Sequence, residues 1–405
     1  MIKVESTLQC ILDDLEKEGT TKSHEMVIYS IKAPQNGHGP RYYLEGMGKK
    51  PFIRMNSNSY LGLSRHPKVI EAEERAAKKF GSGPGAVRFI SGTFKPHIIL
   101  ENRLAQFHHK PSAMILSSAY VTSMGVIYPL ITPETIVISD ELNHNCIINA
   151  IRISRPKEKY IYHHNDMEDL ENKLNTSKGK GKRVLVITDG VFSMRGDFAP
   201  LNALVPLCKK YDDFFEEGVI SIVDDSHGVG AFGKTGRGTE EYTDTTVDIL
   251  IGTLGKAFGV NGGYVTGSQI LIQYLRETAP MYIYSNPITA SEAAAAEAAL
   301  SIVDSSEGHA LLEWLNDLTQ RFKLGVKNVG YETILGPHPI VPIMIRNTEK
   351  TGKLTKYLHQ NGILATGLNY PVVPKGEEEI RFQISTEHTE KDVDYVLSVM
   401  KNAAM

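Results

Sequence analysis

Short apolar runs alternate with helical stretches along the middle of the chain, and this alternation constrains the fold more than any other feature. The runs are rich in β-branched residues, as is typical of strands that are buried on both faces. Stretches such as 167–174 and 201–211 are typical of helices. Because strand–helix alternation favours right-handed crossovers, we expect an α/β fold with a mostly parallel central sheet and helices on both faces. The predicted strands are 135–139, 159–162, 183–188, 219–223 and 248–252.

Three parts of the chain differ in character. Residues 1–55 are polar with a helix-like start, and we interpret them as an N-terminal arm. The alternating pattern predicts a large domain over 56–288. An Ala-rich stretch, 289–303, is a strong helix former and is expected to lead into a smaller α+β domain over 289–405. In that domain we predict strands at 340–345 and 380–384 and helices at 352–360 and 390–400.

Charge and cysteine usage limit the possible partners and location. The net charge of −3 gives no broad reason to expect binding to nucleic acid. The uncharged stretch 111–133 is rich in Ser and Thr and bounded by prolines, which favours a buried strand–turn–helix over membrane insertion. Three widely spaced cysteines form no metal motif and predict no disulfide framework, so we expect no metal site and a cytoplasmic location.

One glycine-rich stretch, Gly228–Thr235, resembles a phosphate-binding loop. It fits both the P-loop and the dinucleotide pattern, and both need a strand directly before the glycines and a helix directly after them. Here Asp224–His227 intervenes after the strand, and Gly236-Arg-Gly238 opposes a helix. We therefore favour a loop that redirects the chain, and keep a nucleotide-binding protein as the alternative function.

Polar clusters follow the predicted strands at 140–144, 189–194, 224–227 and 253–256. Ligands of parallel sheets bind at the carboxyl ends of the strands, so these clusters should lie together. An enzyme of pyridoxal 5'-phosphate (PLP) needs a lysine, a carboxylate for the pyridinium nitrogen and a phosphate cup. Lys256 and Asp224 could supply the first two, although each alone is as easily a structural residue. Ser118-Ala119-Tyr120, at a predicted helix N-terminus, and the Thr253 hydroxyl could hold the phosphate.

A set of motifs in this order resembles the α-oxoamine synthases: Asn58-Ser-Tyr-Leu-Gly62, Gly92-Thr-x-x-x-His97-x-x-Leu-Glu101, Asn143-His144, Thr188-Asp-Gly-Val-Phe-Ser193, Asp224-Asp-Ser-His227, Gly236-Arg-Gly238 and Thr253-x-x-Lys256. The resemblance implies a fold-type I PLP-dependent transferase that condenses an amino acid with an acyl-CoA. The runs 85–93 and 370–376 look closest to the glycine C-acetyltransferase branch, with 8-amino-7-oxononanoate synthase or serine palmitoyltransferase-like activity as alternatives. Lys95-Pro96 and Pro84 depart from that branch. Gly85 and Ala86 favour a small amino acid, glycine or alanine, and an aminotransferase is less favoured.

The resemblance also implies roles for individual residues. Lys256 would form the Schiff base and move the substrate proton, and Asp224 would pair with the pyridinium nitrogen. His227, with Ser193 nearby, would bond the phenolic oxygen of the cofactor, and His144 would stack on the ring and act in catalysis. Ser285 and Asn286 would reach the site of a neighbouring subunit, which implies a homodimer. Arg381, otherwise typical of a surface salt bridge, would bind the substrate carboxylate with Asn58. The phosphate cup would comprise Thr253, Ser118 and the amides of Ala119 and Tyr120.

Overall fold

The computed structural model describes residues 2–17, 21, 25–370 and 372–403. The chain forms two compact units. The first comprises Met1–Ser57, Leu318–Leu335 and Ile340–Met405, and the second comprises Asn58–Asp317 and Gly336–Pro339. We predicted an arm at 1–55 and two domains at 56–288 and 289–405. These boundaries stay a prediction, because compact units are defined by contacts and not by independent folding.

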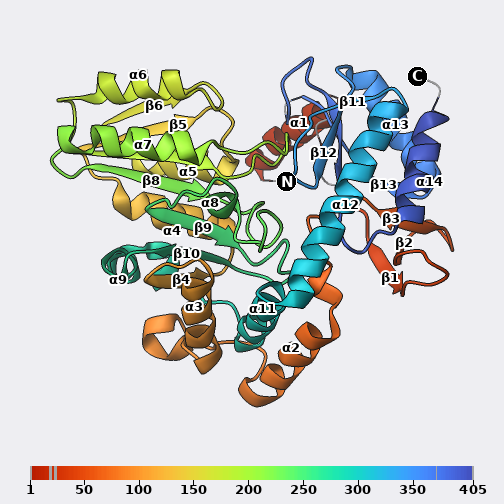
Figure 1. The fold of residues 1–405 in the computed structure, drawn as a ribbon, viewed down its shortest axis with the longest axis horizontal. Helices are drawn as coiled ribbons and strands as arrows, with labels where there is room; N and C mark the ends of the chain where they lie inside the picture. Colours follow the sequence, from red (N-terminus) through yellow and green to blue (C-terminus); the bar gives the residue numbers. More distant parts are fainter. Residues whose placement is uncertain (1, 18–20, 22–24, 371, 404–405) are drawn as a thin grey trace. The chain divides into compact units, whose positions relative to one another are not determined.

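A seven-stranded sheet forms the centre of the second unit (Figure 1). Its strand order is β4-β10-β9-β8-β7-β5-β6, and only β10 runs against its neighbours. All five predicted strands are present, each within a residue of its predicted bounds, so the prediction of a mostly parallel sheet is confirmed. The strands are β4 (Ser112–Leu116), β5 (Thr135–Asp140), β6 (Glu158–Tyr162), β7 (Arg183–Asp189), β8 (Val219–Asp224), β9 (Ile249–Thr253) and β10 (Gly263–Gly267).

Alternate residues of these strands enter separate cores on the two faces of the sheet. In β7, Leu185 and Ile187 pack with α4 (Ala119–Leu130), α5 (Asn145–Ser154) and α9 (Gln269–Thr278). Val184 and Val186 pack with α6 (Met167–Ser177) and α7 (Leu201–Tyr211) on the other face. Since successive side chains of a strand point to opposite faces, a continuous apolar run is what a sheet covered on both sides requires. The uncharged stretch 111–133 forms β4 and α4, as predicted.

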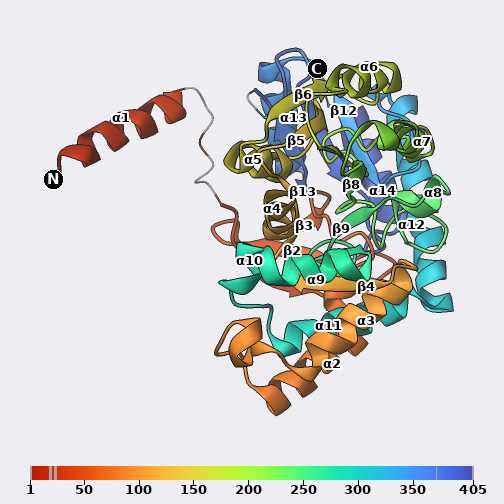
Figure 2. The same cartoon turned by 90° about the vertical axis from the view of Figure 1, so that its left-hand side faces the viewer.

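Helix α11 (Ala290–Val303) lies along α2 (Pro67–Phe80) and α3 (Lys95–Phe107), as Figure 2 shows. Its small side chains, among them Ala293, Ala296 and Ala299, are fully buried, which permits this close packing. Thr289 and Glu292 form a capping box at its start. Shorter helical segments complete the unit: Leu63–Arg65, Arg88–Gly92, Asp212–Phe214, α8 (Thr239–Tyr242) and α10 (Pro280–Ile283).

The first unit holds two four-stranded sheets, β1-β2-β3-β13 and β11-β12-β15-β14, with α13 and α14. Helix α12 (Ser306–Asn328) begins in the second unit and ends in the first.

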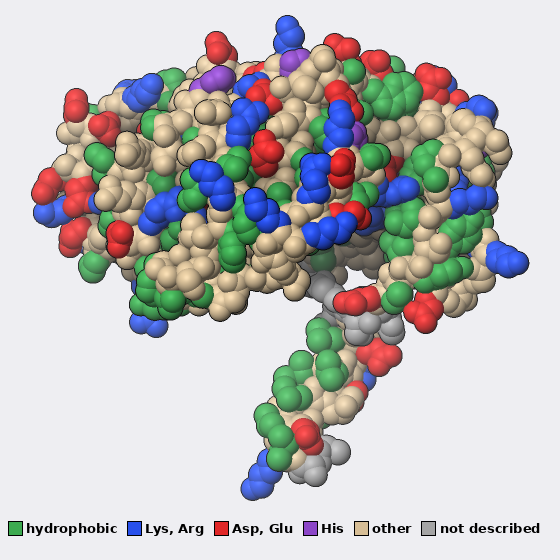
Figure 3. All heavy atoms as spheres, turned by 90° about the horizontal axis from the view of Figure 1, so that it is seen from below, with side chains coloured by type: hydrophobic (Ala, Val, Ile, Leu, Met, Phe, Trp, Pro, Cys, Tyr) green, Lys and Arg blue, Asp and Glu red, His purple; other side chains and the backbone are tan. Residues whose placement is uncertain are grey.

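The apolar side chains of α1 (Lys3–Lys17) are exposed, as Figure 3 shows. No helix within the described residues is long and apolar enough to span a membrane. The remaining bounds are β1 (Ile28–Lys32), β2 (Arg41–Leu44), β3 (Pro51–Arg54), β11 (Glu332–Thr333), β12 (Ile340–Met344), α13 (Thr348–Gln360), β13 (Ile363–Leu364), β14 (Thr366–Leu368), β15 (Glu379–Gln383) and α14 (Glu390–Lys401).

The stretch Gly228–Thr235 lacks the context of a phosphate-binding loop. No helix begins at its end, and the Thr235 amide and hydroxyl both bond the Glu241 carboxylate, at 3.0 and 2.7 Å. Its first glycine, Gly228, lies against the buried Asp225 carboxylate, as does Gly238 just beyond the stretch. A Cβ atom on Gly228 or Gly238 would lie 2.1 or 2.0 Å from an Asp225 oxygen.

We predict that Gly228→Ala destabilises the protein by about 2 kcal/mol or more, because the added methyl group overpacks the Asp225 site. The free energy of unfolding, measured by urea denaturation, checks this. Gly83→Ala is the matched control, since a Cβ atom there meets no atom within 4 Å among the described residues. Equal stability of the two variants would contradict the packing argument.

Candidate active site

A pocket lies at the carboxyl ends of the parallel strands, where the polar clusters were predicted to meet. It encloses about 350 Å³ of empty space, open solvent included, which is near the lower end of the range for small-molecule sites. The structure brings together at this pocket most of the residues that sequence analysis singled out for the cofactor: Ala119, Tyr120, His144, Ser193, Asp224, His227 and Lys256.

Asp224, the last residue of β8, is almost fully buried, and both of its carboxyl oxygens accept hydrogen bonds. The Ser226 hydroxyl and amide donate to Oδ1 at 2.6 and 3.1 Å. The Ser123 hydroxyl donates to Oδ2 at 2.7 Å, and the Cys146 thiol approaches the same oxygen at 3.6 Å. These donors fix the orientation of the Asp224 carboxyl group.

His144 is the N-cap of α5, and this backbone role fixes its ring. Nδ1 accepts from the Cys146 amide at 3.3 Å, which makes Nδ1 an acceptor. The residue is accessible from the pocket, yet the surrounding protein removes enough water to lower the pKa of its imidazole, with Asp224 opposing the shift and Lys256 adding to it. A neutral ring in contact with the pocket can stack on a flat ligand and exchange a proton.

Asp189, the last residue of β7, is a second buried acid beside Asp224, its neighbour across the strand pair. Its Oδ2 accepts from the His144 amide at 3.0 Å, so it helps to place that residue. Burial raises the pKa of Asp189 well above its usual range, the Asp224 charge adds to the rise, and the His144 amide and Lys256 oppose it. Because a raised pKa favours the protonated form, Asp189 adds little negative charge beside Asp224.

His227 is fixed by two neighbours. Its Nδ1 lies 2.7 Å from the Tyr60 hydroxyl, and its carbonyl oxygen accepts from Nε2 of His338 at 2.9 Å. The Tyr60 hydroxyl also lies 3.5 Å from Oδ1 of Asn58. Asn58, which we predicted to bind substrate, is therefore joined to the pocket through Tyr60 and His227.

The predicted phosphate cup is only partly formed by pocket-lining residues. Ser118 caps α4 by accepting from the Val121 amide at 3.2 Å, which confirms a helix N-terminus directly after β4. Thr253 ends β9, and its Oγ1 accepts from the Gly255 amide. Gly263 of β10 joins these elements, since it pairs with Thr253 and a Cβ atom on it would lie 2.5 Å from the Ala119 amide nitrogen. Neither Ser118 nor Thr253 lines the pocket itself, and their roles stay predictions.

Three predicted residues lie away from the pocket lining. Ser285 and Asn286 follow α10 in a partly exposed segment. Arg381 lies on β15 in the first unit, and Gln383, with its amide turned so that nitrogen faces the Met55 carbonyl, accepts from Arg381 Nη1 and Nε at 2.6 and 3.0 Å. The roles of all three in a partner's site and in substrate binding stay predictions.

Sequence reasoning assigned no role to several residues of the site. Asp189 and Ser226 stood inside the predicted strand-end clusters, and Tyr60 stood inside a quoted motif, so signals for these were present. Ser123 and Cys146 gave no signal, because each reaches Asp224 from a helix that covers the sheet. Within the described residues, no group of three or more acids, histidines or cysteines is placed to hold a metal ion.

Comparison with known proteins decides the family. Residues 50–400 match the family described as aminotransferase class I and II. The chain belongs to this family. The 8-amino-7-oxononanoate synthase 1 of Bacillus velezensis is 40% identical over 376 residues, 92% of this chain and 93% of that protein. The mitochondrial 2-amino-3-ketobutyrate coenzyme A ligase of Homo sapiens is 38% identical over 397 residues, 97% of this chain and 90% of that protein.

Comparison with solved structures supports the same family assignment. Serine palmitoyltransferase from S. paucimobilis with bound PLP–myriocin aldimine superposes with a TM-score of 0.87 at 27% identity, covering 98% of this chain and 96% of that one. Serine palmitoyltransferase of Sphingomonas wittichii gives 0.88 at 25%, covering 99% and 97%. The predictions of an α-oxoamine synthase, of fold type I and of PLP as cofactor are confirmed. The donor set fits the cofactor, with a lysine, a buried carboxylate and a neutral histidine around one pocket.

We predict that Ser123→Ala weakens PLP binding about tenfold or more, since one charge-assisted hydrogen bond to Asp224 is worth about 1.5–3 kcal/mol. Equilibrium dialysis of the apoenzyme against PLP measures the change. Cys146→Ser is the matched variant at the same Oδ2 atom, and its stronger donor should leave the affinity within about twofold of wild type. Unchanged affinity in Ser123→Ala would show that this bond does not hold the carboxylate for the cofactor.

Proposed function

We propose that this enzyme forms a carbon–carbon bond between the α-carbon of a small amino acid, glycine or alanine, and the acyl carbon of an acyl-CoA, with release of CoA. The supporting observation is that Lys256, Asp224 and His144 line one pocket at the strand ends of a chain whose relatives include an oxononanoate synthase and a ketobutyrate CoA ligase. The proposed product is an α-amino ketone or a 2-amino-3-oxo acid.

Bound PLP supplies the electron sink that stabilises a carbanion at the α-carbon of the amino acid. Lys256 would hold the cofactor through its side-chain amine, and that amine would remove the α-proton of the amino acid. Asp224 would accept a hydrogen bond from the pyridine nitrogen of the cofactor, and the three donors from Ser123 and Ser226 prevent the carboxyl group from turning away. His144 would stack on the ring, and its imidazole would orient or protonate the thioester oxygen as the carbon–carbon bond forms. When the carbonyl re-forms and the C–S bond breaks, that proton would leave with the CoA thiol.

The remaining roles fall to residues of the pocket lining and to residues outside it. Arg381 would bind the substrate carboxylate through two parallel hydrogen bonds, a geometry that lysine cannot reproduce, and Asn58 would assist it. Ser118, Ala119, Tyr120 and Thr253 would hold the phosphate of the cofactor, and His227 with Ser193 would bond its phenolic oxygen. Ser285 and Asn286 enter the site of the neighbouring subunit, so the working form is a homodimer. The free cysteines are compatible with a cytoplasmic enzyme.

The choice of amino acid has weaker support than the chemistry. The sequence favours a tight site at Gly85, but a Cβ atom on it would meet no described atom within 4 Å. Its φ of +71° is reason enough for glycine. Relatives of two branches match at 38–40% identity, which favours neither the ketobutyrate CoA ligase nor the oxononanoate synthase reaction.

We predict that Lys256→Ala loses the visible absorbance of lysine-bound PLP and reduces turnover about a thousandfold or more, since general-base catalysis alone contributes about 10²–10⁴-fold. Absorbance spectra and CoA release measure the two effects. Lys234→Ala, in the P-loop-like stretch, is the matched control and should keep both signals. A fully coloured and active Lys256→Ala protein would place the cofactor elsewhere.

A panel of amino acids tested against acyl-CoAs of increasing chain length distinguishes the branches. We expect glycine or alanine to give CoA release at least about tenfold faster than serine, because the proposed site takes a small side chain. The rate of thiol release, followed with a chromogenic reagent, provides the measurement. A preference for serine would favour the serine palmitoyltransferase-like alternative, and no CoA release with any pair would refute the proposed reaction.

A further inference from the structure

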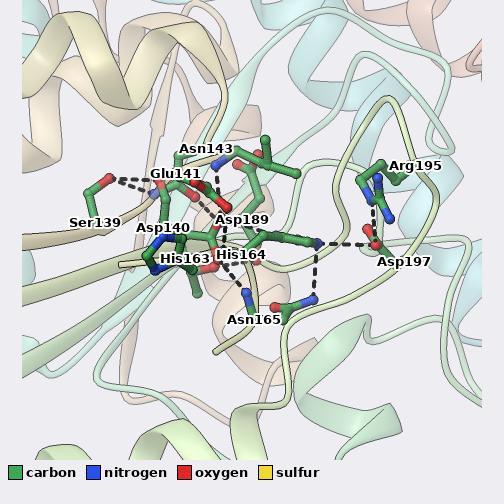
Figure 4. A network of polar contacts seen from close by, with 12 residues as sticks. Ser139, Asp140, Glu141, Asn143, His163, His164, Asn165, Asp189, Arg195 and Asp197 are labelled. Atoms are coloured by element: carbon green, nitrogen blue, oxygen red, sulfur yellow. Dashed lines mark hydrogen bonds and ion pairs between the residues drawn. The ribbon is translucent and has the colours of Figure 1, made fainter. Parts of the chain in front are cut away.

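A second polar network lies behind the pocket-lining loops, and His164 stands at its centre (Figure 4). His164 follows β6, and each of its ring nitrogens faces a carboxylate. Nδ1 lies 3.2 Å from Oδ1 of Asp140, and Nε2 lies 3.1 Å from Oδ2 of Asp197. Its side chain is only 14% exposed, so few water molecules can replace either partner.

Two facing carboxylates favour a protonated ring, because only an imidazolium can donate from both nitrogens. Burial opposes protonation, but the hydrogen bonds that the ring donates to Asp140 and Asp197, with the charges of both acids, outweigh it and raise the pKa of His164 to about 9. Arg195 also bonds Asp197 at 2.9 Å and keeps the pKa of that acid low, together with His164 itself.

The other neighbours of His164 are polar or aromatic. Glu141 accepts from the His164 backbone amide at 2.8 Å, and the Phe192 ring packs edge to face at 4.3 Å between centroids. The Asn165 side-chain nitrogen lies 3.2 Å from Nε2 and donates to the Phe198 carbonyl at 3.2 Å. As a donor it competes with a proton on Nε2, so the case for a cationic ring rests on the two carboxylates.

The two carboxylates belong to the two loops that carry pocket residues. Asp140 ends β5, and its oxygens accept from the amides of Leu142 and Asn165 at 2.9 and 3.0 Å. This turn leads directly to His144. Asp197 closes the loop after β7, where its carbonyl accepts from the Phe192 amide at 2.9 Å. That loop presents Val191 and Ser193 to the pocket.

We propose that His164 is a positioning residue, which ties the 140–144 loop to the 190–197 loop and thereby fixes His144 and Ser193 for the cofactor. The inference rests on the proposed cofactor site and adds a residue that does not line the pocket. Asn143 reinforces the same arrangement, since it donates to the Ile187 carbonyl and accepts from the Asp189 amide, both at 2.8 Å.

The tie should depend on pH in a defined direction. The pKa of His164 is raised above the ordinary 6.5, so its stabilising contribution is complete below about pH 6.5 and is lost as pH rises through about 9. PLP affinity of the wild-type protein should therefore weaken across that interval, because the His164 imidazolium loses its proton.

The experiment measures PLP dissociation constants by equilibrium dialysis between pH 6 and pH 10 for wild type, His164→Gln and Asp197→Asn. We expect His164→Gln to bind PLP about tenfold more weakly at pH 7, as for the loss of one charge-assisted hydrogen bond, and to lack the step near pH 9. Asp197→Asn keeps the ring but removes one charge, so the step should move to lower pH. His163→Asn is the matched control, because its side chain is 75% exposed on the same turn, and it should behave as wild type.

The outcomes separate this inference from the proposed function. A wild-type protein that shows no PLP bound at Lys256 would overturn both. Wild-type binding together with an unchanged affinity and pH profile in His164→Gln would overturn the positioning role alone. A His163→Asn variant that loses affinity as strongly as His164→Gln would also overturn it, because the effect would then belong to the turn as a whole. If His164→Gln does not fold, an unmoved step in Asp197→Asn overturns the inference.

Discussion

The site depends on keeping acidic groups buried side by side at the carboxyl ends of β7 and β8. Asp189 and Asp224 are partners across these strands, and Asp225 follows directly. Burying like charges together is unfavourable, and each acid meets this cost differently. Asp224 receives donors from Ser123 and Ser226, whereas Asp225 is bonded by the Thr239 amide and hydroxyl and still has its pKa raised to about 7. The raised pKa values of Asp189 and Asp225 reduce the negative charge at these strand ends, while the Ser123 and Ser226 donors fix Asp224 in the pocket that Lys256 also lines.

Much of this arrangement could be predicted from the sequence, because the fold is specified by a local and repetitive signal. Runs such as Val184–Ile187 are apolar at every position, and only a sheet with both faces covered buries them all. Once the strands are parallel, their carboxyl ends share an edge, so the polar residues that follow them must gather there. Lys256, Asp224 and His144 were found in this way. The antiparallel direction of β10 was not predicted, since a short glycine-bounded run carries no sign of its direction.

The remaining features depend on packing, which the sequence does not display. Ser123 lies on α4, one turn after the helix begins, and it meets Asp224 only because α4 packs over β8 to β10. His164 has an ordinary sequence setting, and its importance appears only when Asp140 and Asp197, from two other loops, face its ring. The Gly228–Thr235 stretch shows the opposite case. It matches a phosphate-binding pattern, yet its first glycine, Gly228, is required by the space that the Asp225 carboxylate occupies.

The pocket explains the chemistry that relatives share better than it explains their differences. An oxononanoate synthase and a ketobutyrate CoA ligase match this chain equally well and along almost its whole length. In the proposed site Lys256, Asp224 and His144 would serve the cofactor, and the substrates of either reaction would then meet the same three groups. Residues that are common to both reactions cannot select between them, because selection requires a difference in affinity for the competing substrates. The determinants of amino acid and acyl chain therefore lie among residues outside this constellation.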